Sequence, residues 1–216
     1  MTRRETSPRP TKKGYEMFWG LVEGNVNIPS GALHYLSFGK GQKNLIIIQG
    51  LNVRDIKGAG ASLAFMYKKF SKEYKVWFFD RRAVVKDGLT NWDLAEDIYL
   101  AMKELDIESA DLFGVSQGGM IAQYLAIDRP DLVHRLVLAV TLSRNNETVK
   151  AVVGNWMEMT QQGAWKALVE NMAVKMYSDA YVKRYRLFMP LLTILQKPKD
   201  MQRFIILAKS CLTCNA

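Results

Sequence analysis

The sequence predicts an α/β fold: a mostly parallel sheet with helices on both faces, an N-terminal antiparallel hairpin and a helical cap. Three observations predict it. Short apolar runs alternate with helical spacings between residues 44 and 140. A hairpin pattern precedes them in residues 20–38, and a run of helical segments without strands follows them. Strands that alternate with helices form parallel sheets, because each crossover helix returns the chain to the same edge.

Four apolar runs are predicted to be strands of the parallel sheet. They are LIIIQ (45–49), VWFFD (76–80), DLFGV (111–115) and RLVLAV (135–140). Such uninterrupted apolar runs are typical of strands that are buried on both faces. Ahead of them, the turn residues PSG (29–31) predict the tip of the hairpin.

Helical spacing appears between the strands and again after them. Leu94, Ile98 and Met102 form one apolar face, and Thr90 and Asp93 ahead of it stand in capping-box positions. Residues 58–71 and 117–127 supply the other two helices of the core. After Val140 only helical patterns follow. We therefore expect a basic disordered tail (1–13), a sheet core (14–144) and a helical cap (145–216).

The distribution of charge excludes several classes of partner. The net charge of +9 divides into +4 for residues 1–13, zero for 14–144 and +5 for 145–216. The balanced core argues against a nucleic-acid partner, and the basic tail has no aromatic residues among its charges.

The stretch LFMPLLTILQ is too short to span a bilayer, and no secretory signal is recognised. We expect a cytoplasmic protein.

The most informative motif is Gly114-Val115-Ser116-Gln117-Gly118, a G-x-S-x-G pattern. It directly follows an apolar strand and begins a helical face. In this position the glycines allow a sharp turn that exposes the serine hydroxyl above the N-terminus of the next helix. The placement predicts that Ser116 is a nucleophile.

Three further segments accompany this motif: the strand ends IIIQGLNV and FFDRR, and the segment DRPDLVHRLVL. Together with the motif, they make the chain resemble the α/β-hydrolase family from residue 20 onward. The resemblance implies a serine hydrolase that acts on small ester-type substrates, with no cofactor and no metal. It also implies that the backbone N–H groups of Leu51 and Gln117 form the oxyanion hole. Gln49 replaces the usual histidine before Gly50. Serine rather than aspartate at position 116 argues against dehalogenase chemistry, whereas esterase, thioesterase, lipase, acyltransferase and C–C hydrolase activities stay open.

The resemblance also implies an acid and a histidine after Ser116, and the sequence does not supply them clearly. His34 precedes the motif as a strand residue, and His134 is predicted at the opposite edge of the sheet. Glu147 is the nearest candidate acid. We expect the missing groups to follow Ala216 in a longer chain, and such a complete protein to be the enzyme. For these 216 residues, a non-catalytic protein that binds a ligand or partner, or an inactive fragment, is the alternative.

Three further expectations concern the cap and the sheet edge. Trp156, Met157 and Trp165 are candidates to line a substrate pocket, although their spacing also fits plain helix packing. Cys211 and Cys214 have metal-site spacing, but no second pair completes such a site, so two buried or semi-exposed thiols are expected. Without a further strand after RLVLAV the sheet has an exposed edge, and we expect the chain to associate with itself there.

Overall fold

The structure is a computed structural model, and it describes residues 19–185, 187 and 200–216. Its centre is a six-stranded sheet with the order β1-β2-β4-β3-β5-β6. The strands are β1 (Val22–Ile28), β2 (Gly31–Phe38), β3 (Lys43–Ile48), β4 (Tyr74–Phe79), β5 (Ala110–Val115) and β6 (Val133–Ala139). The predicted hairpin is confirmed, because β1 and β2 pair antiparallel around the turn at residues 29 and 30. β4, β3, β5 and β6 are parallel, as the alternating pattern predicted.

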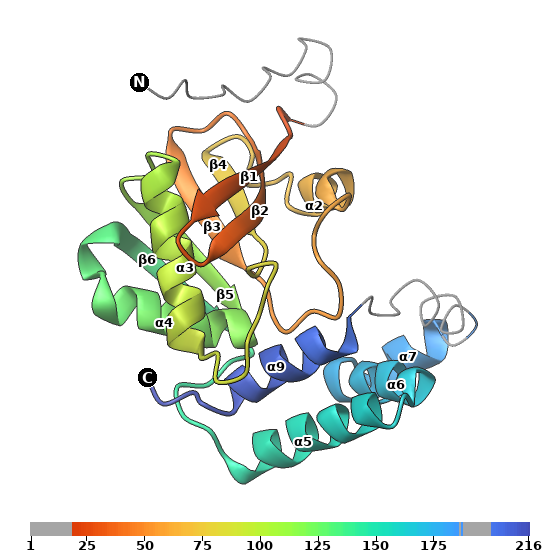
Figure 1. Cartoon of the computed structure of the whole chain (residues 1–216). Helices are drawn as coiled ribbons and strands as arrows, with labels where there is room; N and C mark the ends of the chain where they lie inside the picture. Colours follow the sequence, from red (N-terminus) through yellow and green to blue (C-terminus); the bar gives the residue numbers. More distant parts are fainter. Residues whose placement is uncertain (1–18, 186, 188–199) are drawn as a thin grey trace.

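Helices cover both faces of the sheet (Figure 1). On one face, α3 (Asn91–Glu104) and α4 (Gln117–Asp128) pack against the side chains of Ile46, Ile48 and Leu112. On the other face, α2 (Gly60–Met66) packs against Leu45 and Ile47. The predicted capping box at the start of α3 is present. A short 3-10 helix, η1 (Pro130–Leu132), leads into β6.

The chain after β6 is helical in its described part: α5 (Glu147–Gln161), α6 (Trp165–Met176), α7 (Asp179–Tyr185) and α9 (Met201–Cys211). α9 lies along the carboxyl edge of the sheet, with α5 on its far side (Figure 1). Phe204 and Ala208 of α9 join a buried cluster with Val153 of α5 and Leu168 of α6. The expected tail (1–13) and most of the predicted helix in residues 181–198 lie outside the described residues.

β6 differs from its prediction as a buried strand. It is the last strand in the order of the sheet, and β5 is its only strand partner in the described chain. Leu136, Val137 and Leu138 are 36%, 54% and 44% exposed. The apolar run correctly predicted a strand, but burial on both faces needs covering elements such as those that pack against β3 and β4.

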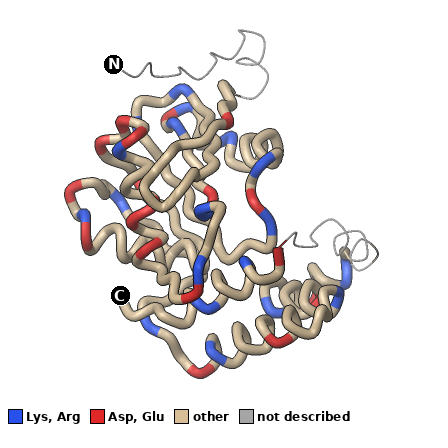
Figure 2. Tube along the Cα trace, in the orientation of Figure 1, with Lys and Arg blue, Asp and Glu red and all other residues tan. Residues whose placement is uncertain are grey.

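Charged residues of both signs are interspersed along the trace of the sheet core (Figure 2), in agreement with the balance found in the sequence. None of the helices in the described ranges has both the length and the hydrophobicity that a bilayer span requires.

Candidate functional site

Ser116 stands at the turn between β5 and α4, where its φ of 53° and ψ of −121° are unusual for a residue other than glycine. Four hydrogen bonds hold this conformation. The Ser116 N–H donates to Ala139 O at 2.9 Å, and Ser116 O accepts from Gly119 N, Met120 N and Thr141 Oγ1. Ser116 is an exposed residue. Strain held in this way by the surrounding structure is common at functional residues.

Glycines make the close packing around this turn feasible. A Cβ atom on Gly118 would lie 1.9 Å from Ile48 O, so only glycine lets α4 begin directly against the end of β3. A Cβ atom on Gly114 would lie 2.6 Å from Gly118 O. These two glycines are the ones that the G-x-S-x-G pattern contains.

Of the two predicted oxyanion donors, Gln117 directly follows Ser116 in the chain, and Leu51 follows a glycine that lies beside Ser116. A Cβ atom on Gly50 would lie 3.6 Å from Ser116 Oγ, so the chain just before Leu51 passes beside the hydroxyl. Gln117 is the first residue of α4, where the N–H has no carbonyl partner within the helix. The Gln117 side chain is buried and donates from Nε2 to Leu207 O and Ser210 Oγ, both at 2.9 Å. It thereby ties α9 to the turn.

Neither histidine of the chain lies at Ser116. His134 is the second residue of β6, at the amino edge of the sheet, where its Nε2 lies 2.7 Å from Ser109 Oγ. Five residues of strand, about 16 Å, separate it from Ala139 at the turn. His34 is on β2, close to the carboxyl edge, because its carbonyl accepts from Asp80 N. β4 and β3 lie between β2 and β5, so three strand spacings, about 14 Å, separate it from Ser116.

The other predicted site residues are distributed over the cap helices. Trp156, Met157 and Trp165 all pack against the buried cluster of α5, α6 and α9, which also touches Leu51. Trp156 Nε1 donates to Asn171 Oδ1 at 3.0 Å. The carboxylate of Glu147 is exposed in the first turn of α5 and pairs with Lys150 at 2.9 Å.

The two cysteines are free and buried. Burial raises the pKa of the Cys211 thiol to about 12 and also raises the pKa of Cys214. Both are therefore protonated at neutral pH and are poor nucleophiles and poor metal ligands. Their placement fits the expectation of two buried or semi-exposed thiols.

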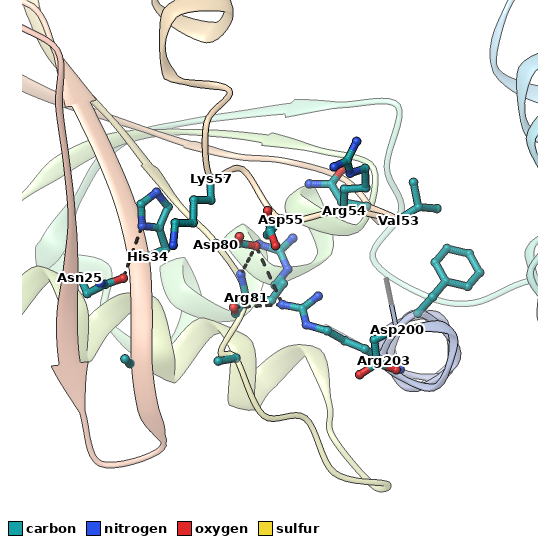
Figure 3. Close-up of a pocket in the computed structure, with 14 residues that line it drawn as sticks. Asn25, His34, Val53, Arg54, Asp55, Lys57, Asp80, Arg81, Asp200 and Arg203 are labelled. Atoms are coloured by element: carbon teal, nitrogen blue, oxygen red, sulfur yellow. Dashed lines mark hydrogen bonds and ion pairs between the residues drawn. The ribbon is translucent and has the colours of Figure 1, made fainter. Parts of the chain in front are cut away.

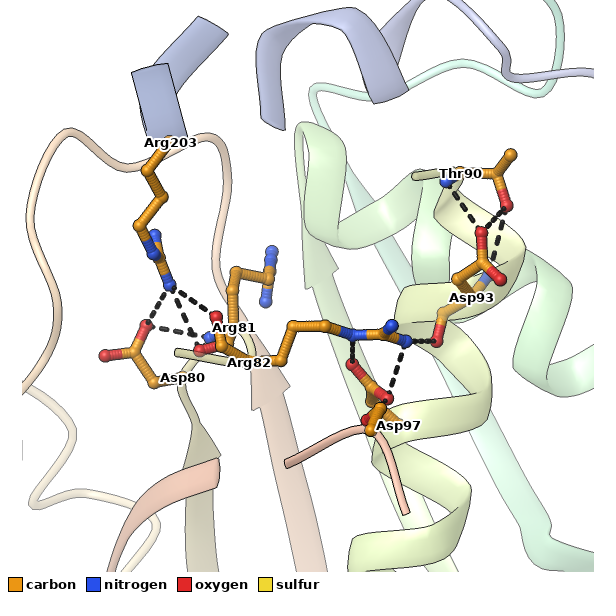
Figure 4. Close-up of polar contacts among 8 residues, drawn as sticks. Asp80, Arg81, Arg82, Thr90, Asp93, Asp97 and Arg203 are labelled. Atoms are coloured by element: carbon orange, nitrogen blue, oxygen red, sulfur yellow. Dashed lines mark hydrogen bonds and ion pairs between the residues drawn. The ribbon is translucent and has the colours of Figure 1, made fainter. Parts of the chain in front are cut away.

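Asp80, Arg81 and Arg82 organise the loops at the carboxyl end of β4 (Figure 4). Asp80 accepts from the N–H groups of Ile56 and Arg81 at 2.9 and 2.8 Å. Arg81 donates to Gln49 O at 2.6 Å, at the end of the strand that leads to Leu51. Arg82 forms a two-pronged ion pair with Asp97 of α3. These contacts fix the loops that follow β3 and β4 against each other and against α3.

Sequence reasoning missed a cavity of about 400 Å³ beside this cluster (Figure 3). The β1–β2 hairpin, the loop that follows β3, the end of β4 and the start of α9 all contribute to its wall. His34 and Arg203 meet there although they are 169 positions apart (34 and 203). Only the cluster at the end of β4 gave a signal in the sequence, because the other contributions depend on how α9 folds back over the sheet.

Comparisons with known proteins agree with this architecture. The family model described as alpha/beta hydrolase fold matches residues 45–190, and no curated protein sequence matches the chain. A solved structure of MGS-M2, an alpha/beta hydrolase enzyme from a Medee basin deep-sea metagenome library, matches at 20% identity with a TM-score of 0.74. The match covers 89% of this chain and 73% of that one.

Two other solved structures are similar. The enol-lactonase from Burkholderia xenovorans matches at 19% identity with a TM-score of 0.71, over 89% of this chain and 74% of that one. A carboxylesterase structure from Nitrososphaera gargenis matches at 18% identity with a TM-score of 0.68, over 88% and 72%. Likeness at such identities shows the fold alone. Together with the family model, which spans more than half of the residues, it shows that the chain belongs to the α/β hydrolase fold family.

Proposed function

We propose that this chain carries the nucleophile and the oxyanion donors of a serine hydrolase that acts on carboxylic ester-type substrates. The observation that carries the proposal is the strained, exposed Ser116 at the start of α4, with Gly50 packed beside its hydroxyl. A positive φ costs a residue other than glycine about 1–3 kcal/mol, and such strain is common at functional sites.

The chemistry would proceed by acyl transfer. Ser116 Oγ adds to the ester carbonyl carbon, and the carbonyl oxygen becomes an oxyanion that accepts from the N–H groups of Leu51 and Gln117. Collapse of this intermediate breaks the bond to the alcohol, which leaves with a proton. Water then releases the acid from the acylated Ser116. Trp156, Met157 and Trp165 remain the proposed lining for the apolar part of the substrate.

The proton of Ser116 needs an acceptor, and the positions of the two histidines do not provide one. His34 and His134 are both too far from Oγ for a hydrogen bond. The proposal therefore assigns the nucleophile and the oxyanion donors and leaves the base unassigned. The same observation favours a second candidate function, in which this fold binds a small ligand or a partner without turnover.

A fluorophosphonate probe distinguishes these functions, because it phosphonylates only an activated serine. We expect the probe to label Ser116, as located by peptide mass spectrometry, and Ser116→Ala to reduce the labelling rate and the hydrolysis of 4-nitrophenyl acetate at least about 100-fold. Ser109→Ala is the matched control, because Ser109 lies at the other edge of the sheet yet has a histidine within 2.7 Å. It should leave both rates unchanged.

Two results would contradict the proposal. Labelling that persists in Ser116→Ala would place the reactive serine elsewhere. A chain that neither reacts with the probe nor hydrolyses the ester would favour the binding function.

A further inference from the structure

The charges at the end of β4 do not balance. Asp97 is fully engaged by Arg82, which reaches it at 2.7 and 2.8 Å. Asp80 has two cationic neighbours: the buried Arg81, and Arg203 at 3.9 Å. Around Asp80, two arginines therefore share one carboxylate (Figure 4), which leaves one positive charge in excess there.

This excess charge lies in a poorly hydrated place. Arg81 is only 8% exposed, and burial lowers the pKa of its guanidinium to about 10, which still leaves it charged at neutral pH. The side chain of Arg203 is 18% exposed, and its Nη2 donates to the carbonyls of Arg81 and Arg82. A partly buried cation without a full counter-charge is unfavourable, and an anion beside it would offset that cost.

The cavity offers such an anion a place (Figure 3). Its charged lining residues are four cations, Arg54, Lys57, Arg81 and Arg203, and three carboxylates, Asp55, Asp80 and Asp200. The lining thus has the same excess of one positive charge. The start of α9, an 11-residue helix, also borders the cavity, and there the Asp200 carboxylate caps the helix by accepting from Arg203 N at 2.9 Å.

The uncharged lining residues indicate the chemical character of the rest of the ligand. Val53, Phe204, Ala32 and Ala83 contribute apolar surface, and Asn25 and Asn52 contribute amides. A volume of about 400 Å³ is typical of a small-molecule pocket. The combination suits a compact molecule with one anionic group and an apolar body.

We propose that this cavity, between the β1–β2 hairpin, the loop that follows β3 and the start of α9, is a binding site for a small organic carboxylate. One negative charge neutralises the excess that Arg81 and Arg203 leave. The proposal goes beyond the hydrolase function, because binding there requires neither Ser116 nor a base. Since Arg81 also donates to Gln49 O, an occupant would contact a side chain that supports the strand end before Leu51.

Calorimetric titration of the full chain with 3-phenylpropionate tests this proposal, and the uncharged 3-phenylpropionamide serves as the matched ligand. At low salt we expect the acid to bind at least about tenfold more tightly than the amide, and added salt to reduce the difference. Arg203→Gln should weaken acid binding about tenfold or more. Lys166→Gln, the same loss of charge at an exposed position on α6, should leave it unchanged.

Lys57→Gln provides a second variant if Arg203→Gln does not fold, because Lys57 is an exposed residue of the lining. It should weaken acid binding severalfold. Equal binding of acid and amide, no binding of either up to about 10 mM, or equal losses in Lys57→Gln and Lys166→Gln would overturn the proposal. Phenyl phosphate binding more tightly than the carboxylate would overturn the assignment to a carboxylate.

Discussion

β5 and β6 are neighbours of similar composition with different surroundings. Both follow from apolar runs in the sequence, and they pair in parallel with Leu112 opposite Leu136 and Phe113 opposite Val137. Leu112 is fully buried, whereas Leu136 is 36% exposed and Val137 is 54% exposed. β5 has a strand on each side, and in the described chain β6 has one only. An apolar run therefore determines that a strand forms, while its neighbours determine how much that strand stabilises the fold.

The ends of the two strands repeat this difference. Ser116 after β5 and Val140 after β6 both have a positive φ, 53° and 47°. Ser116 is fixed by hydrogen bonds from both sides, and Gly50 packs against it. Val140 is 86% exposed. A positive φ is thus part of a candidate active site only at Ser116, where the surrounding glycines and strands are close.

The largest expected effect on stability comes from truncating one of two paired side chains, Leu112 in β5 or Leu136 in β6. Leu112→Ala should lower the free energy of unfolding by about 2–5 kcal/mol, because it leaves a cavity in a rigid, fully buried site. Leu136→Ala should cost only about 1 kcal/mol, since solvent already reaches this side chain. Urea unfolding of both variants measures the two values. Equal losses would show that β6 is as well covered as β5 in solution.

A smaller effect should separate the strain at Ser116 from the function of its hydroxyl. Ser116→Ala and Ser116→Gly both remove the oxygen, but only glycine adopts a φ of 53° without steric cost. The glycine variant gains flexibility in the unfolded chain, which offsets part of the relief. We expect it to be more stable than the alanine variant by about 1 kcal/mol. A glycine variant that melts at or below the temperature of the alanine variant would argue against a strained turn.

Much of the fold could be predicted because its signals are local. The alternation of apolar runs and helical faces gave the parallel strands, and Thr90 and Asp93 gave the start of α3. The prediction that β6 is buried on both faces was wrong, because burial depends on elements that are distant in the sequence. Residues 58–71 were predicted as one helix, and the structure forms only the seven residues Gly60–Met66, without a side-chain cap.

The candidate site was predictable where its residues lie in a local motif or at the end of a predicted strand. Gly114, Ser116 and Gly118 lie in one motif, and the sequence alone also placed Gly50 and Leu51 at the end of the neighbouring strand. The cavity could not be predicted, because His34, Arg81 and Arg203 come from three separate segments. The roles of Leu51 and Gln117 as donors and of Trp156, Met157 and Trp165 as pocket residues stay predictions.

The smallest effect on stability should accompany a change in association. Unpaired strand edges with exposed apolar side chains pair readily with other chains, and β6 has both features in the described chain. We expect the protein to form concentration-dependent oligomers, and Val137→Lys to shift it toward the monomer while changing the free energy of unfolding by less than about 0.5 kcal/mol. Val84→Lys is the control, because Val84 is 67% exposed but lies outside the strands. Light scattering across a concentration series measures the mass. Equal effects of Val84→Lys and Val137→Lys on the measured mass, or a parent protein that is monomeric at every concentration, would show that the chain does not associate through β6.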